Sequence, residues 1–118
     1  RGLGDVYKRQ KKLGEPVESR EYRMKIMGED DFRSYGENVL KVFEQRAAEA
    51  GIRAAKPSYE GVRLVFPDGW ALLRMSLHDP QMPLNIESRK KGGVAEIAAK
   101  VQEFLQGFTS LDMSVFKD

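Results

Sequence analysis

Residues 61–75, GVRLVFPDGWALLRM, decide the fold that the sequence predicts. Every second residue over 62–66 is a large apolar side chain, which is the two-residue period of a half-buried strand. Pro67-Asp68-Gly69 then has the composition of a tight turn, and an apolar return strand follows over 70–75. The segment therefore predicts an antiparallel β-hairpin, and we expect its Trp70 to lie in the core.

Before the hairpin, residues 22–27 alternate in the same way and predict another strand. After the turn-forming residues 28–31, apolar side chains recur at helical spacing and predict a helix that ends at Gly51. Two starts are open for this helix. Ser34 has capping-box spacing to Glu37, whereas an aspartate within 28–31 would cap an earlier start. Residues 52–60 show no period and predict an irregular connection.

After the hairpin, a polar loop over 76–83 leads to a short strand over 84–88 and a turn over 89–93. The last helix has an apolar stripe made of Val94, Ile97, Ala98, Val101, Leu105 and Phe108. The element order is β-α-β-β-β-α. We predict an α+β fold of two layers, in which a four-stranded antiparallel sheet carries both helices on one face.

Composition excludes several classes of function. The 118 residues allow one domain, and the absence of cysteine excludes disulfides, thiolate zinc sites and thiol catalysis. No apolar run is long enough to span a bilayer. The formal charge of +2 comes entirely from residues 1–10, because removing their three basic and one acidic residues leaves 17 of each sign. We therefore expect a soluble cytoplasmic protein with no nucleic-acid or membrane partner.

The chain divides into four predicted segments. Residues 1–10 resemble a translated sequencing adapter and are predicted to be non-native, although a natural basic arm is the alternative. This reading implies that the chain is the carboxyl-terminal remainder of a longer protein. Residues 11–19 predict an interdomain linker, 20–108 the folded domain, and 109–118 a tail that either packs across a neighbouring domain or is frayed.

The best candidate for a functional site is the segment 74–80, Arg-Met-Ser-Leu-His-Asp-Pro, which lies between two predicted strands. An arginine at a strand end offers a planar fork of donors, and Ser76 adds a hydroxyl two residues later. With free backbone N–H groups in a tight loop, these side chains could cradle a phosphate. On physical grounds alone, a solvated sheet edge followed by a turn explains the same residues.

In this segment the sequence resembles the C-terminal domain of the α-D-phosphohexomutases, the phosphoglucomutase and phosphomannomutase superfamily. The family motif is Arg-x-Ser-(Gly/Asn)-Thr-(Glu/Asp)-Pro, and it follows a hairpin similar to 59–70 and precedes a strand similar to 83–87. Ser19-Arg20-Glu21 lies where the family has Ser-Gly-Glu. The likeness covers about 18–108 and implies a fold like that of the TATA-box-binding protein.

The resemblance implies that Arg74, Ser76, Leu77 and His78 bind the phosphate of a phosphosugar. Leu77 stands where the family has glycine or asparagine, and His78 stands where it has threonine. His78 could replace the lost hydroxyl as a donor, or it could point away. We expect Asp79 to brace the loop rather than contact an anion.

The resemblance also implies what this chain lacks. The family's phosphoserine segment, its Asp-x-Asp-x-Asp magnesium loop and its Gly-Glu-x-Ser sugar loop do not occur in the sequence. We therefore predict an inactive fragment of an isomerase, with no catalytic residue, metal site or cofactor of its own. Mg²⁺ and the missing N-terminal domains would belong to the full-length enzyme. The alternative is a small α+β nucleic-acid-binding or regulatory module without catalysis.

Overall fold

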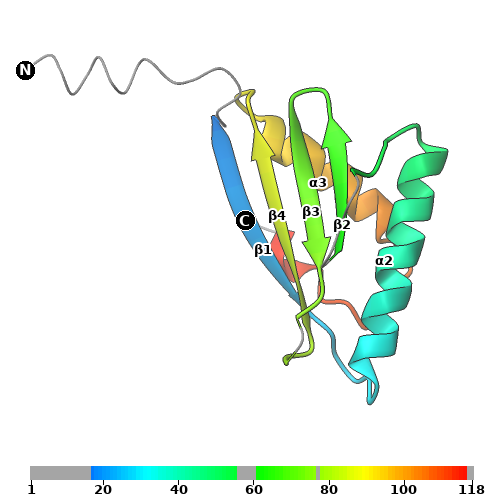
Figure 1. Ribbon diagram of the computed structural model, residues 1–118. Coiled ribbons are helices and arrows are strands. Elements are labelled where there is room, and N and C mark those ends of the chain that lie inside the picture. Colours follow the sequence, from blue (N-terminus) through cyan, green and yellow to red (C-terminus); the bar gives the residue numbers. More distant parts are fainter. Residues whose placement is uncertain (1–16, 56–60, 77, 117–118) are drawn as a thin grey trace, which may run out of the picture.

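One four-stranded antiparallel sheet carries both long helices on the same face (Figure 1). The computed structural model describes residues 17–55, 61–76 and 78–116. Its elements are β1 (Glu18–Lys25), α2 (Phe32–Glu49), β2 (Gly61–Phe66), β3 (Gly69–Arg74), β4 (Gln81–Ser88), α3 (Gly93–Phe104) and the 3-10 turn η1 (Ser114–Phe116). The predicted fold class and element order are confirmed.

The sheet has the order β1-β4-β3-β2, so β2 of the hairpin is an edge strand and β4 lies between the hairpin and β1. In β2 and β3 the predicted hairpin forms with a two-residue turn, because Phe66 pairs directly with Gly69. A Cβ at position 69 would collide with the Glu87 carbonyl of β4, so this turn position requires glycine.

The core lies between the sheet and the helices. Every second residue of each strand faces this core. Those on the two central strands, such as Leu73 and Leu84, are fully buried. Helix α2 contributes Val39 and Phe43, whose ring meets Phe104 of α3 edge-on at 6.2 Å between centroids. The predicted stripe of α3 is buried from Val94 through Leu105, as expected of the face that an amphipathic helix turns to a sheet.

The start of α2 shows which of the two caps is used. Asp31 is the N-cap, and its carboxylate accepts hydrogen bonds from the Ser34 nitrogen at 3.1 Å and the Ser34 hydroxyl at 2.8 Å. These hydrogen bonds lower the pKa of Asp31. The earlier start is therefore confirmed. The capping box that begins at Ser34 is wrong, because Ser34 already lies inside the first turn.

Two strands are longer than predicted. β1 begins at Glu18 instead of 22, and β4 begins at Gln81 instead of 84. Pro83 was predicted to end the loop, since proline has no N–H to donate to a ladder. In the structure the β3–β4 ladder stops at the Leu73–Leu84 pair, one residue short of Pro83, while β4 continues along β1 to Gln81. Proline is tolerated at this position because Pro83 is paired with β1 only and has no partner in β3.

Trp70 does not lie in the core, and that prediction is wrong. Gly69, Ala71 and Leu73 of β3 face the helices, so Trp70 faces the opposite side of the sheet and is half-buried there. The Arg63 guanidinium of β2 lies over its ring, 4.4 Å from the centroid. An apolar run hides this alternation, because both parities contain apolar residues, Ala71 and Leu73 on one face and Trp70 and Leu72 on the other.

Flanking segments cover parts of both sheet edges. Ala54 forms an isolated bridge with Leu64 of β2, so the connection predicted as irregular contains a short pairing. Leu111 bridges to Ile26 beyond the end of β1, and Phe116 packs on Tyr22 with 4.6 Å between ring centroids. The described part of the tail therefore packs on its own sheet and is not frayed. Among the residues described, no helix is long and apolar enough to cross a membrane.

Candidate functional site

The candidate site lies where β3 ends and the chain turns toward β4. Arg74 is the last residue of β3, and its cross-strand neighbour in β2 is Gly61, which has no side chain to crowd it. The loop lies at the same end of the sheet as the first turn of α2 (Figure 1). Met75 points to that helix and packs where Gly36 leaves room, since a Cβ at position 36 would overlap the Met75 sulfur.

Hydrogen bonds hold the loop as a tight turn. The Ser76 nitrogen donates to the Gln81 carbonyl at 3.0 Å, and the Gln81 nitrogen donates to the Asp79 carbonyl at 2.8 Å. The Ser76 hydroxyl accepts from the Asp79 nitrogen at 3.3 Å. Because that bond uses the serine only as an acceptor, its O–H proton can still be donated to a ligand.

The predicted site residues are placed as follows. Arg74 lies on the strand parity that faces away from the helices, Ser76 follows two residues later beyond the end of β3, and both are half-buried. His78 is exposed on the loop, and Leu77 lies outside the described residues. Asp79 is exposed, and its backbone nitrogen and carbonyl both form hydrogen bonds in the turn. The binding roles themselves stay predictions.

Arg74 has an unusual environment for a charged side chain. Its Nε atom is shielded from solvent and has no hydrogen-bond partner in the structure as described. Buried guanidinium donors are almost always paired, so an unpaired one is costly unless a ligand supplies the acceptor. Arg74 also lines a groove of about 400 Å³ on the open face of the sheet, together with Trp70, Leu72 and Asn85.

The sequence interpretation missed two features of this groove. Trp70 was assigned to the core, and Asn85 was not considered. Both residues can be found from strand alternation once the pairing of β3 with β4 is known, because directly paired residues lie on the same face of the sheet. Leu72 pairs with Asn85 and Trp70 pairs with Glu87, so each pair shares the open face with Arg74. Finding them requires the strand pairing, which the sequence did not determine.

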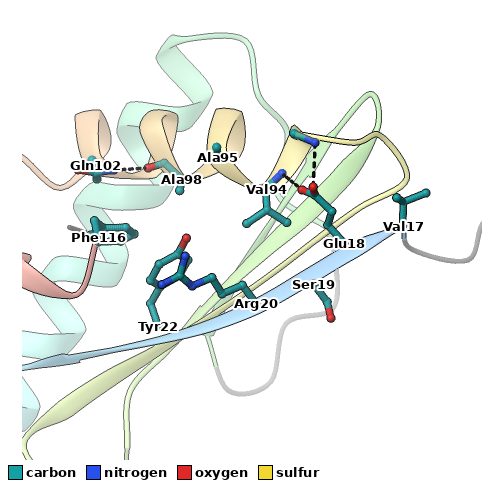
Figure 2. A pocket seen from close by; sticks show the side chains of 11 residues that line it. Val17, Glu18, Ser19, Arg20, Tyr22, Val94, Ala95, Ala98, Gln102 and Phe116 are labelled. Atoms are coloured by element: carbon teal, nitrogen blue, oxygen red, sulfur yellow. Dashed lines mark hydrogen bonds between the residues drawn. The ribbon is translucent and has the colours of Figure 1, made fainter. Parts of the chain in front are cut away.

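A second groove lies between β1 and α3, where Glu18 is bonded to the helix (Figure 2). Its carboxylate accepts from the Gly92 nitrogen at 2.9 Å and from the Val94 nitrogen at 3.2 Å. These backbone hydrogen bonds lower the pKa of Glu18. Because the carboxylate is used to cap α3, this groove offers a structural contact rather than a free reactive group.

A metal site requires several donor side chains that converge on one point. No group of three or more histidine, cysteine, aspartate or glutamate side chains in residues 17–55, 61–76 and 78–116 could hold an ion.

Comparison with solved structures finds proteins of similar fold. The fold is similar to part of a phosphoglucomutase/phosphomannomutase family protein from Burkholderia thailandensis, with a TM-score of 0.59 and 20% sequence identity. The match covers 80% of this chain and 18% of that protein, so this chain corresponds to a small part of its length. No protein-family model and no curated protein matches the sequence.

Proposed function

We propose that this chain contains the phosphate-binding domain of a phosphohexomutase and holds the non-transferring phosphate of a hexose phosphate. The observation that carries the proposal is Arg74, whose shielded Nε lacks an acceptor at the edge of a tight loop. Ser76 lies two residues away with a donor hydroxyl. The similar fold of a mutase-family protein supports the assignment.

In this proposal the domain binds and orients substrate but performs no bond-making step. Arg74 supplies two or more charge-assisted N–H donors to the phosphate oxygens. Ser76 donates its hydroxyl, and the backbone N–H groups around Leu77 and His78 complete the cradle. In this proposal the phosphoryl-transfer residues and Mg²⁺ belong to further domains of a full-length isomerase.

Titration of the 118-residue chain with inorganic phosphate, followed by amide NMR shifts, tests the proposal. We expect a dissociation constant near 1 mM, about −4 kcal/mol, since one domain supplies only part of a cleft. Arg74→Ala should weaken binding by about 1.5–3 kcal/mol. Arg53→Ala, the same change at an exposed arginine on another part of the surface, is the matched control and should bind like the parent.

Two results would contradict the assignment. If Arg74→Ala binds phosphate as well as the parent chain, the anion is not held at this strand end. If Arg74→Ala and Arg53→Ala weaken binding equally, the interaction is diffuse attraction to positive charge and not a site.

One observation favours the alternative, a nucleic-acid-binding module. Trp70 lies on the open face of the sheet with Arg63 over its ring, as a base-stacking residue would. Glu21 and Glu87 line the same groove beside Arg20, however, and Glu21 is paired with Arg23 at 3.3 Å, so this face mixes both signs of charge and lacks the one-sign basic field of a nucleic-acid interface. We therefore expect no binding of a single-stranded RNA oligonucleotide under conditions in which inorganic phosphate binds.

A further inference from the structure

β1 lies at one edge of the sheet, with β4 on its inner side. Along an antiparallel strand, successive backbone groups point alternately toward one side and the other. The Ile26 nitrogen donates at 2.7 Å to the carbonyl of Pro80, directly before β4, whereas the Lys25 carbonyl accepts at 2.8 Å from the Asp112 nitrogen of the tail. The N–H and C=O groups of the odd-numbered residues of β1 therefore point outward, away from β4.

The tail already pairs with the C-terminal end of this edge. The Met27 nitrogen donates to the Ser110 carbonyl at 2.7 Å, and Leu111 forms an antiparallel bridge with Ile26. The Leu111 side chain is buried in the core. Residues 110–112 therefore act as a short added strand, held by backbone hydrogen bonds and by one apolar side chain that enters the core.

The N-terminal half of the edge is open. Ser19 and Glu21 are exposed, and in the described ranges 17–55, 61–76 and 78–116 no backbone hydrogen bond reaches either residue from outside the sheet. Outward-pointing N–H and C=O groups on an edge strand are a template for pairing with another strand. The first half of β1 therefore offers a second segment the kind of pairing that the tail makes with the other half.

A groove of about 580 Å³ runs beside this open half, between β1 and α3 (Figure 2). Ala95 and Ala98 line it on the helix side, and Phe116, packed on Tyr22, closes one end. Val17, which is 49% exposed, lies at the other end. Because side chains alternate between the two faces of a strand, every second side chain of a strand added to β1 would enter this groove.

The two glutamates of this edge already have partners. Glu18 accepts hydrogen bonds from the Gly92 and Val94 nitrogens and so caps α3. Glu21 points to the opposite face of the sheet, where its carboxylate is paired with Arg23 at 3.3 Å. Neither carboxylate is therefore left to attract a basic side chain into the groove.

Positive charge lines the groove at Arg20. Its guanidinium lies over the Tyr22 ring, 4.7 Å from the centroid, on the floor of the groove. An arginine has five N–H donors, so a further carboxylate can bind beside the contacts that Arg20 already makes. The groove therefore suits a segment that carries an apolar side chain and, two residues away on the same face, an acidic one.

We propose that the open half of the β1 edge binds an extended segment of another polypeptide as an added antiparallel strand, with an apolar side chain in the groove and an acidic side chain beside Arg20. Backbone hydrogen bonds at Ser19 and Glu21 would hold the segment, and the groove would select its side chains. This surface is separate from the Arg74 loop, so the two proposals are tested independently.

The probe is the synthetic peptide acetyl-Thr-Asp-Thr-Val-Thr-Asp-Thr-amide, titrated into the full 118-residue chain and followed by amide NMR. We expect saturable binding with a dissociation constant below about 1 mM. The amide signals of Ser19 and Glu21 should shift most, because their N–H groups gain acceptors. Those of Arg20 and Tyr22, whose N–H groups point toward β4, should shift less.

Two altered peptides separate the backbone contribution from the side-chain contribution. N-methylation of the two threonines next to valine removes the N–H groups that would face β1 and should weaken binding by at least about tenfold. Replacement of both aspartates by lysines should weaken binding by about three- to tenfold, because lysine is repelled by Arg20.

A matched pair of variants tests the groove. Ala95→Phe puts a bulky ring at an exposed groove position of α3 and should abolish binding. Ala99→Phe, the same change at an exposed position of α3 outside the groove lining, should bind like the parent chain. Arg74→Ala should also bind the peptide like the parent chain.

Each other outcome overturns this assignment. Undiminished binding of the N-methylated peptide would show that no strand is added, and undiminished binding by Ala95→Phe would place the peptide elsewhere. Amide shifts of Ser19 and Glu21 that depend on protein concentration without peptide would assign the edge to a second copy of the chain. No saturable binding up to about 5 mM peptide would refute the surface altogether.

Discussion

The Ser88 hydroxyl occupies the space that a Cβ on Gly93 would need. Ser88 is only 1% exposed, and its oxygen accepts from the Lys90 nitrogen at 3.0 Å and donates to a carbonyl, that of Lys90 at 3.1 Å or Asp68 at 3.3 Å. This one hydroxyl joins the end of β4 to the hairpin turn and to the first residue of α3. The junction sets how closely the helix approaches the sheet.

Gly93→Ala should therefore destabilise the chain by about 1–3 kcal/mol, the usual cost of overpacking. Ser88→Gly removes the obstructing side chain, so in that background Gly93→Ala should cost much less. Chemical denaturation of the two single variants and the double variant measures the coupling between the sites. Additive effects within about 0.5 kcal/mol would mean that the two residues do not compete for one space.

Glu18→Gln should lower the thermal midpoint at neutral pH, because Gln keeps the shape but loses the charge that favours the N-terminus of α3. The pKa of Glu18 is lowered in the folded state, so its contribution is present above the unfolded pKa and is lost as pH falls through the folded pKa. The difference in midpoint between parent and variant should therefore shrink below about pH 4.

Glu103→Gln, the same substitution at an exposed position in the last turn of α3, should not lower the midpoint at neutral pH, because a carboxylate at the C-terminal end of a helix is not favoured by the macrodipole. A difference between the parent chain and Glu18→Gln that stays constant from neutral to acid pH would contradict the charge-based account of this contact.

Phe116→Ala should destabilise the domain by about 1–2 kcal/mol, less than a fully buried phenylalanine, because the ring is half-buried on Tyr22. Val65→Ala on the open face should cost less than about 0.5 kcal/mol, since Val65 is 49% exposed. Equal stability of Phe116→Ala and the parent chain in urea would show that the tail contributes no packing.

His78→Thr introduces the residue that the family motif has at this position. We expect inorganic phosphate to bind within about threefold of the parent affinity, because a threonine hydroxyl and an imidazole N–H can each donate one hydrogen bond. His78→Ala should weaken binding by about fivefold, which corresponds to one lost hydrogen bond of about 1 kcal/mol. Unchanged binding in His78→Ala would show that the exposed imidazole points away from the anion.

The sequence by itself determined the fold class and the place of the candidate loop. Alternation over 62–66 and the Pro67-Asp68-Gly69 turn specify a hairpin through local chemistry, and the stripe from Val94 to Leu105 specifies a helix with one buried face. Such signals depend on residues within a few positions of each other. The arginine at the end of β3 and the serine that follows it are recognisable for the same reason.

Tertiary structure decided what depends on pairing between distant strands. Trp70 and Leu72 sit in an apolar run, and only the register of β3 against β4 shows that they face away from the helices beside Asn85 and Glu87. The extension of β4 to Gln81 likewise depends on pairing with β1, more than 50 residues away in sequence. A one-residue shift of register would move every such side chain to the other face, so the open-face groove exists only once the whole sheet has formed.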